Sequence, residues 1–370
     1  MAEIEIGLGK HGRRAYGWDE LAIVPSRRTR DPADVDVSWE IDAYTFPLPV
    51  MAAPLDSVSS PATCVALGRL GGVGVLNLEG LWTRYEDPEP VLEELAAAAD
   101  GWDSAQALRA AYAEPIKAEL IGERIAELRA AGVVSCAALT PQRTAEYATE
   151  ILKAELDLFV IHGTIVSAEH VSRTVEPLNL KRFVRELEVP VIVGGCTSYQ
   201  AALHLMRTGA AGVLVGAGAG KADRVADVLG VGVPPATAIA DARAARMRHL
   251  DETGVYVHVI ADGGMTTGGD VAKAIVCGAD AVVLGAPLAG TADAPGRGWT
   301  WSMTAAHSTL PKGSRVPAPP LGTLEQVLVG PASEAGGHTN LVGALRAAMG
   351  LCGYESLKDF QKAELVTTSS

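Results

Sequence analysis

The sequence is poor in cysteine, and its basic residues are outnumbered by acidic ones. Its five cysteines are widely spaced and form no C-x-x-C pair, so neither a disulfide framework nor a zinc site is predicted, and we expect no bound metal. Most of them should be small buried apolar residues. The net charge of −13 would repel nucleic acid and anionic membranes, so neither is an expected partner.

Two kinds of targeting segment are also missing. No apolar run approaches the roughly 18 residues that a membrane-spanning helix requires. The start of the chain, Met-Ala-Glu-Ile-Glu-Ile, has no basic region followed by an apolar stretch, which argues against a signal peptide. We therefore expect a cytoplasmic protein.

Eight short, near-continuous apolar runs are present instead. Such runs are typical of parallel strands that are buried on both faces. They cover residues 49–54, 72–79, 133–139, 156–163, 189–195, 211–217, 257–264 and 279–287. Helical patterns separate them, for example residues 119–131, which end at Gly132. The alternation predicts an α/β fold, and the count of eight favours a (β/α)8 TIM barrel over a doubly wound open sheet.

The chain is predicted to form one barrel domain over residues 1–370, with two departures from a minimal barrel. The connection 80–132 suits two or three helices, whereas a pair of inserted regulatory domains would need on the order of a hundred residues. Residues 291–339 are rich in Gly, Pro and Trp, which suits a flap over a site or, equally, a surface excursion used in subunit contacts. A helix should follow from residue 340, and residues 367–370 should fray.

Glycine-rich loops follow the last two predicted strands, where TIM barrels commonly hold a phosphate. The first runs Asp262-Gly-Gly-Met-Thr-Thr-Gly-Gly-Asp270 and the second Gly285-Ala-Pro-Leu-Ala-Gly290. We predict that the backbone N–H groups of Gly263, Gly264, Gly285 and Ala286 bind phosphate, although the glycines could serve only as tight turns. Asp262 could accept both ribose hydroxyls, or it could cap the following helix.

Two further groups are candidates for the same end of the barrel. The loop 216–224 carries Gly220 and Lys221, which we predict contact the ligand, with Lys221 or Arg224 adding positive charge; a solvated loop is the alternative. His162, at the end of the fourth strand, could be an acid or base or a stacking surface for a purine. It could equally be a histidine that only bonds a neighbouring loop.

Several motifs resemble the IMP dehydrogenase and GMP reductase superfamily in order and spacing. They are Ala52-Ala-Pro-Leu-Asp-Ser-Val58, Gly71-Gly-Val-Gly-Val75, Val257-His-Val-Ile-Ala-Asp-Gly-Gly264, Gly278-Ala-Asp-Ala-Val-Val-Leu-Gly285 and Asp293-Ala-Pro-Gly-Arg297. The related branch without CBS regulatory domains is the closer match. Its motifs are Arg13-Arg-Ala-Tyr16, Leu76-Asn-Leu-Glu-Gly80, Tyr112-Ala-Glu-Pro-Ile116 and Phe360-Gln-Lys362.

The resemblance implies a purine nucleoside monophosphate as substrate, NAD or NADP as cofactor, and a homo-oligomer, a tetramer in the family. The family's nucleophile is a cysteine thiolate that attacks C2 of the purine. Asp223 stands at that position here, and Val225 replaces the threonine that follows at i+2. Asp223 and His162 are therefore the candidate catalytic residues. The predicted cofactor contacts are Gly163 and Thr164, which follow His162 where the dehydrogenases carry Asp-Ser-Ser.

Three functions remain open on these grounds. A purine nucleotide oxidoreductase that lacks the usual cysteine predicts nicotinamide turnover. A non-catalytic purine-nucleotide-binding or regulatory protein predicts binding without turnover. A flavin-dependent barrel is a weaker third hypothesis. Among the other cysteines, Cys196 is the best substitute nucleophile by position, although a buried small residue is the favoured interpretation.

Overall fold

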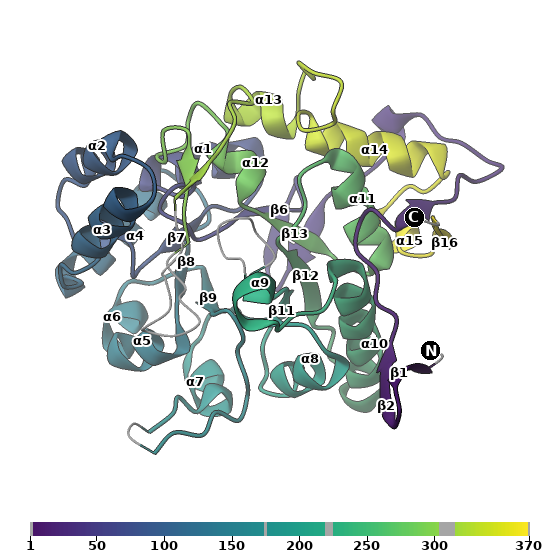
Figure 1. Cartoon of the computed structure of the whole chain (residues 1–370), viewed down its shortest axis with the longest axis horizontal. Helices are drawn as coiled ribbons and strands as arrows, with labels where there is room; N and C mark the ends of the chain where they lie inside the picture. The colour runs from purple at the N-terminus through teal and green to yellow at the C-terminus, as the bar shows by residue number, and fades with distance from the viewer. Residues whose placement is uncertain (1–2, 174–175, 219–224, 303–314, 369–370) are drawn as a thin grey trace.

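A computed structural model of the chain describes residues 3–173, 176–218, 225–302 and 315–368. Eight parallel strands form its centre, in the order β6-β13-β12-β11-β10-β9-β8-β7. They are β6 (Val50–Ala52), β7 (Val75–Asn77), β8 (Cys136–Leu139), β9 (Leu158–His162), β10 (Val191–Cys196), β11 (Gly212–Val215), β12 (His258–Asp262) and β13 (Ala281–Leu284). Figure 1 shows the helices arranged around these strands.

The two ends of this sheet meet, so that the strands close into a barrel. Val73, just before β7, donates its N–H to the carbonyl of Val50 at 2.9 Å and accepts from the N–H of Ala52 at 2.8 Å. The spatial order therefore follows the sequence order around a closed ring. The predicted TIM barrel is confirmed, and the doubly wound sheet is excluded. Each strand is shorter than its apolar run, because the flanking residues enter the loops.

Fifteen α-helices are assigned within the described residues. They are α1 (Pro61–Leu70), α2 (Glu89–Ala97), α3 (Trp102–Ala111), α4 (Ala118–Ala130), α5 (Pro141–Glu146), α6 (Ala148–Lys153), α7 (Leu180–Glu186), α8 (Tyr199–Met206), α9 (Val225–Leu229), α10 (Pro235–Thr253), α11 (Gly268–Cys277), α12 (Ala286–Ala289), α13 (Leu324–Leu328), α14 (Leu341–Leu351) and α15 (Leu357–Phe360). Short 3-10 turns cover Pro32–Asp34 and Leu81–Thr83. Among the described residues, no helix is both long and apolar enough to cross a bilayer.

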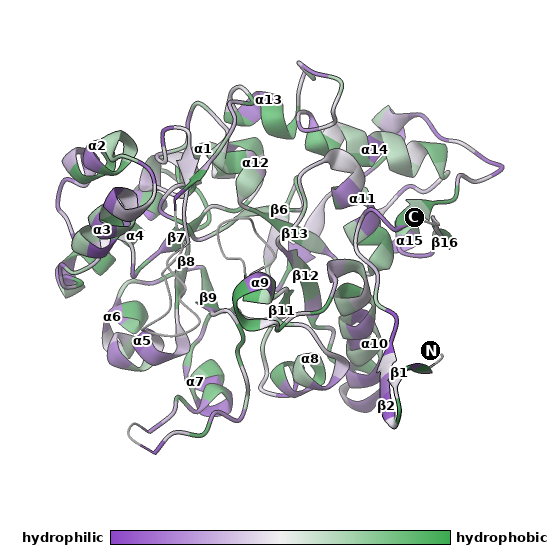
Figure 2. Cartoon of the chain, in the orientation of Figure 1, coloured by the Kyte–Doolittle hydropathy of each residue, from purple (hydrophilic) through white to green (hydrophobic). Residues whose placement is uncertain are grey.

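Local signals explain where these helices begin and end. The hydroxyl of Ser60 accepts from the backbone N–H of Thr63, which starts α1, and Gly71 ends it with a φ of 97°. The helix predicted at 119–131 is α4, and its apolar face is buried, in contact with α1 and α6. Figure 2 shows the matching division between apolar strands and hydrophilic outer helix surfaces, as on α10.

The predicted departures from a minimal barrel are both present. The connection 80–132 holds α2, α3 and α4, as expected; we call residues 80–116 the insert. In the segment 291–339, the described residues form a short hairpin, β14 (Trp299–Thr300) with β15 (Val316–Pro317), and α13. We call residues 291–302 the excursion.

Smaller elements complete the chain at both ends. Two hairpins precede the barrel, β1 (Glu3–Gly7) with β2 (Lys10–Arg13), and β4 (Trp39–Ile41) with β5 (Tyr44–Phe46). The prediction that the tail frays from residue 367 is wrong at its start. The strand β16 (Leu365–Thr367) pairs with β3 (Leu21–Ile23), whose edge satisfies the tail's backbone groups.

Candidate active site

Two of the predicted site residues meet at the carboxyl end of the barrel. His162 is the last residue of β9 and Asp262 the last residue of β12, with β10 and β11 between them. Their Nε2 and Oδ2 atoms lie 3.3 Å apart, and the side chains are 22% and 19% exposed. The pair therefore spans the barrel mouth while staying open to solvent.

Glycines allow the strand ends to come this close. A Cβ on Gly195 would lie 2.1 Å from the carbonyl oxygen of Gly216, and one on Gly216 would lie 2.0 Å from the carbonyl oxygen of Asp262. No side chain fits at either position, because real Cβ atoms do not approach backbone this closely. The ends of β10, β11 and β12 are therefore crowded together on this side of the mouth.

Asp262 does not cap the following helix, contrary to one of the two interpretations above. Helix α11 begins at Gly268, six residues later, and the hydroxyl of Thr267 accepts from the N–H of Asp270. The carboxylate of Asp270 in turn accepts from the N–H groups of Thr266 and Thr267, at 3.0 and 3.1 Å. This capping box satisfies the helix start, so the carboxylate of Asp262 is left for another partner.

The two glycine-rich loops differ in what their glycines do. Gly263 and Gly264 have φ values of 89° and 79°, which a side chain rarely adopts, so the turn itself requires them. Gly285 has a φ of −110°, which any residue can adopt. A Cβ there would lie 3.4 Å from that of Ala53, so the neighbours alone would not forbid one. Backbone conformation thus explains why glycine occupies positions 263 and 264. It does not explain the glycine at position 285, where access of a ligand to the backbone would be one reason.

Cys196, the candidate substitute nucleophile, is buried and protonated. Cys196 is 1% exposed, and its thiol donates to the carbonyl of Leu214 at 3.4 Å. Burial raises the pKa of this thiol to about 12, so it carries its proton at neutral pH. All five cysteines are buried, which confirms the sequence prediction and removes Cys196 as a substitute nucleophile.

Comparison with known proteins decides the family. The model of the IMP dehydrogenase/GMP reductase domain matches residues 15–314. The chain belongs to the IMP dehydrogenase/GMP reductase family. It is 49% identical to an uncharacterized oxidoreductase of Mycolicibacterium smegmatis, covering 99% of this chain and 100% of the relative. An inosine-5′-monophosphate dehydrogenase of Methanocaldococcus jannaschii is 27% identical, covering 95% of this chain and 92% of the relative.

A solved structure supports the same assignment. The crystal structure of an IMP dehydrogenase/GMP reductase-like protein from Corynebacterium glutamicum is 46% identical, with a TM-score of 0.92. The match covers 99% of this chain and 98% of that chain. The family barrel therefore extends over nearly the whole sequence.

On the predicted cofactor side, Gly163 has little backbone left to offer a ligand. Its N–H donates to the carbonyl of Gly194 at 2.9 Å, and its carbonyl accepts from the N–H of Gly195 at 2.8 Å. Thr164 is half-buried and brings one hydroxyl. Of this predicted pair, the side chain of Thr164 is the group able to bind a cofactor.

Four of the predicted site residues belong to the loop after β11. Gly220, Lys221, Asp223 and Arg224 lie outside the described residues. Among the residues that are described, no group of three or more His, Cys, Asp or Glu side chains could hold a metal ion.

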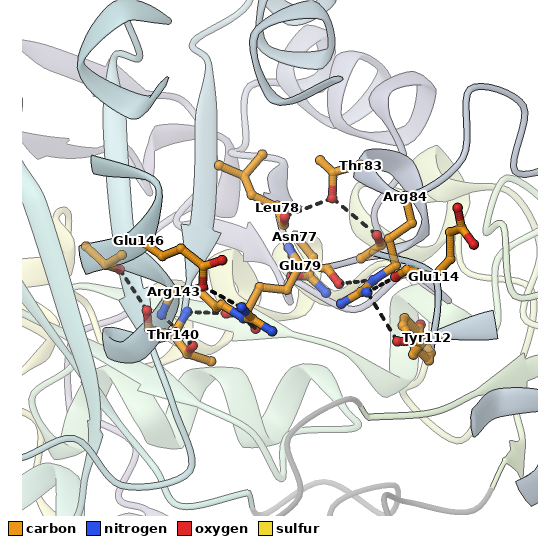
Figure 3. Close-up of polar contacts among 12 residues, drawn as sticks. Asn77, Leu78, Glu79, Thr83, Arg84, Tyr112, Glu114, Thr140, Arg143 and Glu146 are labelled. Carbon is orange, nitrogen blue, oxygen red and sulfur yellow. Dashed lines mark hydrogen bonds and ion pairs between the residues drawn. The ribbon is translucent and has the colours of Figure 1, made fainter. Parts of the chain in front are cut away.

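Sequence reasoning missed a polar cluster at the ends of β7 and β8 (Figure 3). One carboxylate oxygen of Glu79 accepts from the N–H of Thr140 at 2.6 Å, and the other lies 4.0 Å from Nε of Arg143. The side chain of Asn77 accepts from the N–H of Glu79 at 3.0 Å. Glu79 belongs to the motif Leu76-Asn-Leu-Glu-Gly80, a signal that served only to identify the family. The cluster adds a fixed carboxylate to the same end of the barrel.

Proposed function

We propose that this chain is a purine nucleotide oxidoreductase that binds a purine nucleoside monophosphate at the barrel mouth. The observation that carries the proposal is the adjacency of the two predicted binding groups. Asp262 ends β12, Gly285 and Ala286 follow β13, and these strands pair with Asp262 opposite Val283. A carboxylate for ribose thus lies beside a backbone cradle for phosphate, as one nucleotide would require.

Each group has a defined part in this proposal. The carboxylate of Asp262 accepts from the two ribose hydroxyls. The N–H groups of Gly263, Gly264, Gly285 and Ala286 donate to phosphate oxygens, with Gly220 and Lys221 as further ligand contacts. Backbone dipoles can bind an anion without a basic side chain, which suits a protein with a net charge of −13.

His162 is the proposed acid–base group. Its Nε2 lies 3.3 Å from the carboxylate of Asp262, which would hold the imidazole in place while it takes up or releases a proton. Asp223, at the family's cysteine position, remains the second proposed catalytic residue. No described cysteine is exposed, so a thiolate adduct is not part of the proposed reaction.

The family implies a nicotinamide cofactor, and NAD or NADP would supply or accept the hydride when bound. The side chain of the half-buried Thr164 could donate a hydrogen bond to a carboxamide group. We also propose, from the family resemblance, a single-domain homo-oligomer, a tetramer, with residues 291–339 acting as a flap.

The burial of all five cysteines favours a second candidate, a nucleotide-binding protein without turnover. Isothermal titration with IMP, XMP and GMP, each with and without NAD or NADPH, separates the two when combined with the absorbance of reduced nicotinamide. Binding with turnover supports the oxidoreductase, and binding without turnover supports the regulatory protein. If none of the three nucleotides binds, both candidates are wrong.

A further inference from the structure

Several family motifs that the nucleotide site does not use converge at one buried junction beside the mouth. The junction joins the loop after β6, the insert and the excursion. Its members are Asp56, Ser57, Gly80, Arg84, Tyr112, Thr300 and Trp301. These segments are far apart in sequence, so the contacts are specific to the fold.

Asp56 is the centre of the junction and is 0% exposed. Its Oδ2 accepts from the hydroxyl of Tyr112 at 2.6 Å and from the N–H of Leu81 at 3.0 Å. Its Oδ1 is buried and has no hydrogen-bond partner among the described residues. Gly80 packs directly on this oxygen, since a Cβ there would lie 1.9 Å away. A buried carboxylate with one bare oxygen is costly, which favours a proton on that oxygen.

Tyr112 connects this carboxyl to the excursion. Its hydroxyl donates to Asp56 and accepts from Nε1 of Trp301 at 2.8 Å. A second link lies alongside, because the hydroxyls of Ser57 and Thr300 are 3.2 Å apart. The excursion is thus attached through Asp56 and through Ser57, whose carbonyl also accepts from the N–H of Gly296 at 3.1 Å. Arg297 of the excursion in addition pairs with Glu89 and Glu93 of α2, two further titratable groups.

The charges around Asp56 are few. Two titratable side chains of the described residues act on it, Tyr112 and Arg84, both from the insert. The guanidinium of Arg84 donates hydrogen bonds to three backbone carbonyls, those of Glu79 at 2.9 Å, Tyr112 at 3.1 Å and Glu114. Burial raises the pKa of Asp56 to about 6, against the opposing effects of Tyr112, Leu81 and Arg84.

The junction touches the predicted phosphate loop. The N–H of Ala53 donates to the carbonyl of Leu284 at 2.9 Å, and a Cβ on Gly285 would lie 3.6 Å from Leu55. Asp56 is the next residue along the chain. A shift of this loop would therefore move the backbone at Gly285.

We propose that Asp56 and Tyr112 form a proton-dependent latch that fastens the excursion to the barrel and positions the mouth. With a neutral carboxyl, the junction holds no buried negative charge and stays closed. Ionisation places a desolvated charge beside Gly80, and the junction opens more often. Both residues act as positioning residues, and the latch does not depend on which ligand the mouth binds.

Hydrogen exchange measured by mass spectrometry on the full chain tests the latch. The readout is the protection of peptides within residues 293–302, corrected for intrinsic exchange, from about pH 5 to about pH 8. In the unmodified chain, we expect protection to fall about tenfold over this range, since one pKa unit corresponds to a factor of ten. Asp56→Asn should abolish the pH dependence, and Tyr112→Phe should lower protection at every pH.

Tyr85→Phe is the matched control. The hydroxyl of Tyr85 donates to the carbonyl of Ala111 at 2.9 Å in the same insert, so this variant also loses one hydrogen bond. It should leave peptides 293–302 unchanged. The proposal is overturned if Tyr85→Phe matches Tyr112→Phe, or if the unmodified chain shows no pH dependence in these peptides. If Asp56→Asn does not fold, the pH dependence of the unmodified chain and the comparison of the two tyrosine variants still test the latch.

Discussion

The aspartates at the two ends of the barrel differ in their hydrogen-bond partners and in their exposure to solvent. Asp280, just before β13 at the amino end, is 5% exposed and accepts from Arg246, Tyr256 and the N–H of Val259, at 2.7, 2.7 and 2.9 Å. Asp262, at the carboxyl end of β12, has His162 at 3.3 Å and is 19% exposed. A carboxylate surrounded by fixed partners stabilises the fold. Asp262, paired with His162 at a longer distance, keeps capacity for a ligand.

The largest effect should come from the amino end. Asp280→Ala leaves the guanidinium of Arg246 buried without its carboxylate, which should lower the free energy of unfolding by about 3–5 kcal/mol. Urea denaturation measures this loss. Asp262→Ala should change stability by less than about 1 kcal/mol, because a partly exposed pair at 3.3 Å contributes little. If the two variants lost the same free energy of unfolding, the proposed difference between Asp280 and Asp262 would be wrong.

Asp56 is an intermediate case, because it is buried like Asp280 but one of its carboxyl oxygens has no hydrogen-bond partner among the described residues. Its pKa is raised from the ordinary value of 3.8 to about 6, so the folded chain binds this proton more tightly than the unfolded chain. The stability from this group is therefore fully present below pH 3.8 and is lost as the pH rises to about 6. The loss is up to about 3 kcal/mol.

Unfolding free energies of the unmodified chain and Asp56→Asn, compared across that pH window, measure this term. The difference between the two should change with pH and level off above about 6. A constant difference would show that Asp56 does not titrate in the fold.

At the mouth, the expected loss is in binding. Asp262→Ala should weaken purine monophosphate binding by about 1–3 kcal/mol, the usual contribution of hydrogen bonds to a charged group. Isothermal titration measures the change, with the exposed Asp19→Ala as control. Equal affinity in the Asp262→Ala variant and the control would reject the ribose contact.

The smallest effect separates helix capping from ligand binding. Thr267→Ala removes the hydroxyl that starts α11 and should lower stability by about 1 kcal/mol. Thermal unfolding measures this loss. If Asp262→Ala destabilised the chain as much as Thr267→Ala, Asp262 would have to support the helix after all.

Periodicity in the sequence predicted the barrel well, because each buried strand is a continuous apolar run and each helix repeats its apolar face. It also placed His162 and Asp262 at one end of the barrel, since each stands at the carboxyl end of a parallel strand. The capping role of Thr267 was readable in Thr267-Gly-Gly-Asp270, which has the capping-box spacing. The contact of Asp56 with Tyr112 could not be predicted from the sequence, because side chains 56 residues apart leave no local pattern.

A crystal structure of the chain soaked with a purine monophosphate would show directly whether the nucleotide binds at the barrel mouth. We expect the phosphate to bind the backbone N–H groups of Gly263, Gly264, Gly285 and Ala286, and the ribose hydroxyls to bind the carboxylate of Asp262. A mouth filled by side chains, with no nucleotide bound at saturating concentration, would contradict this expectation.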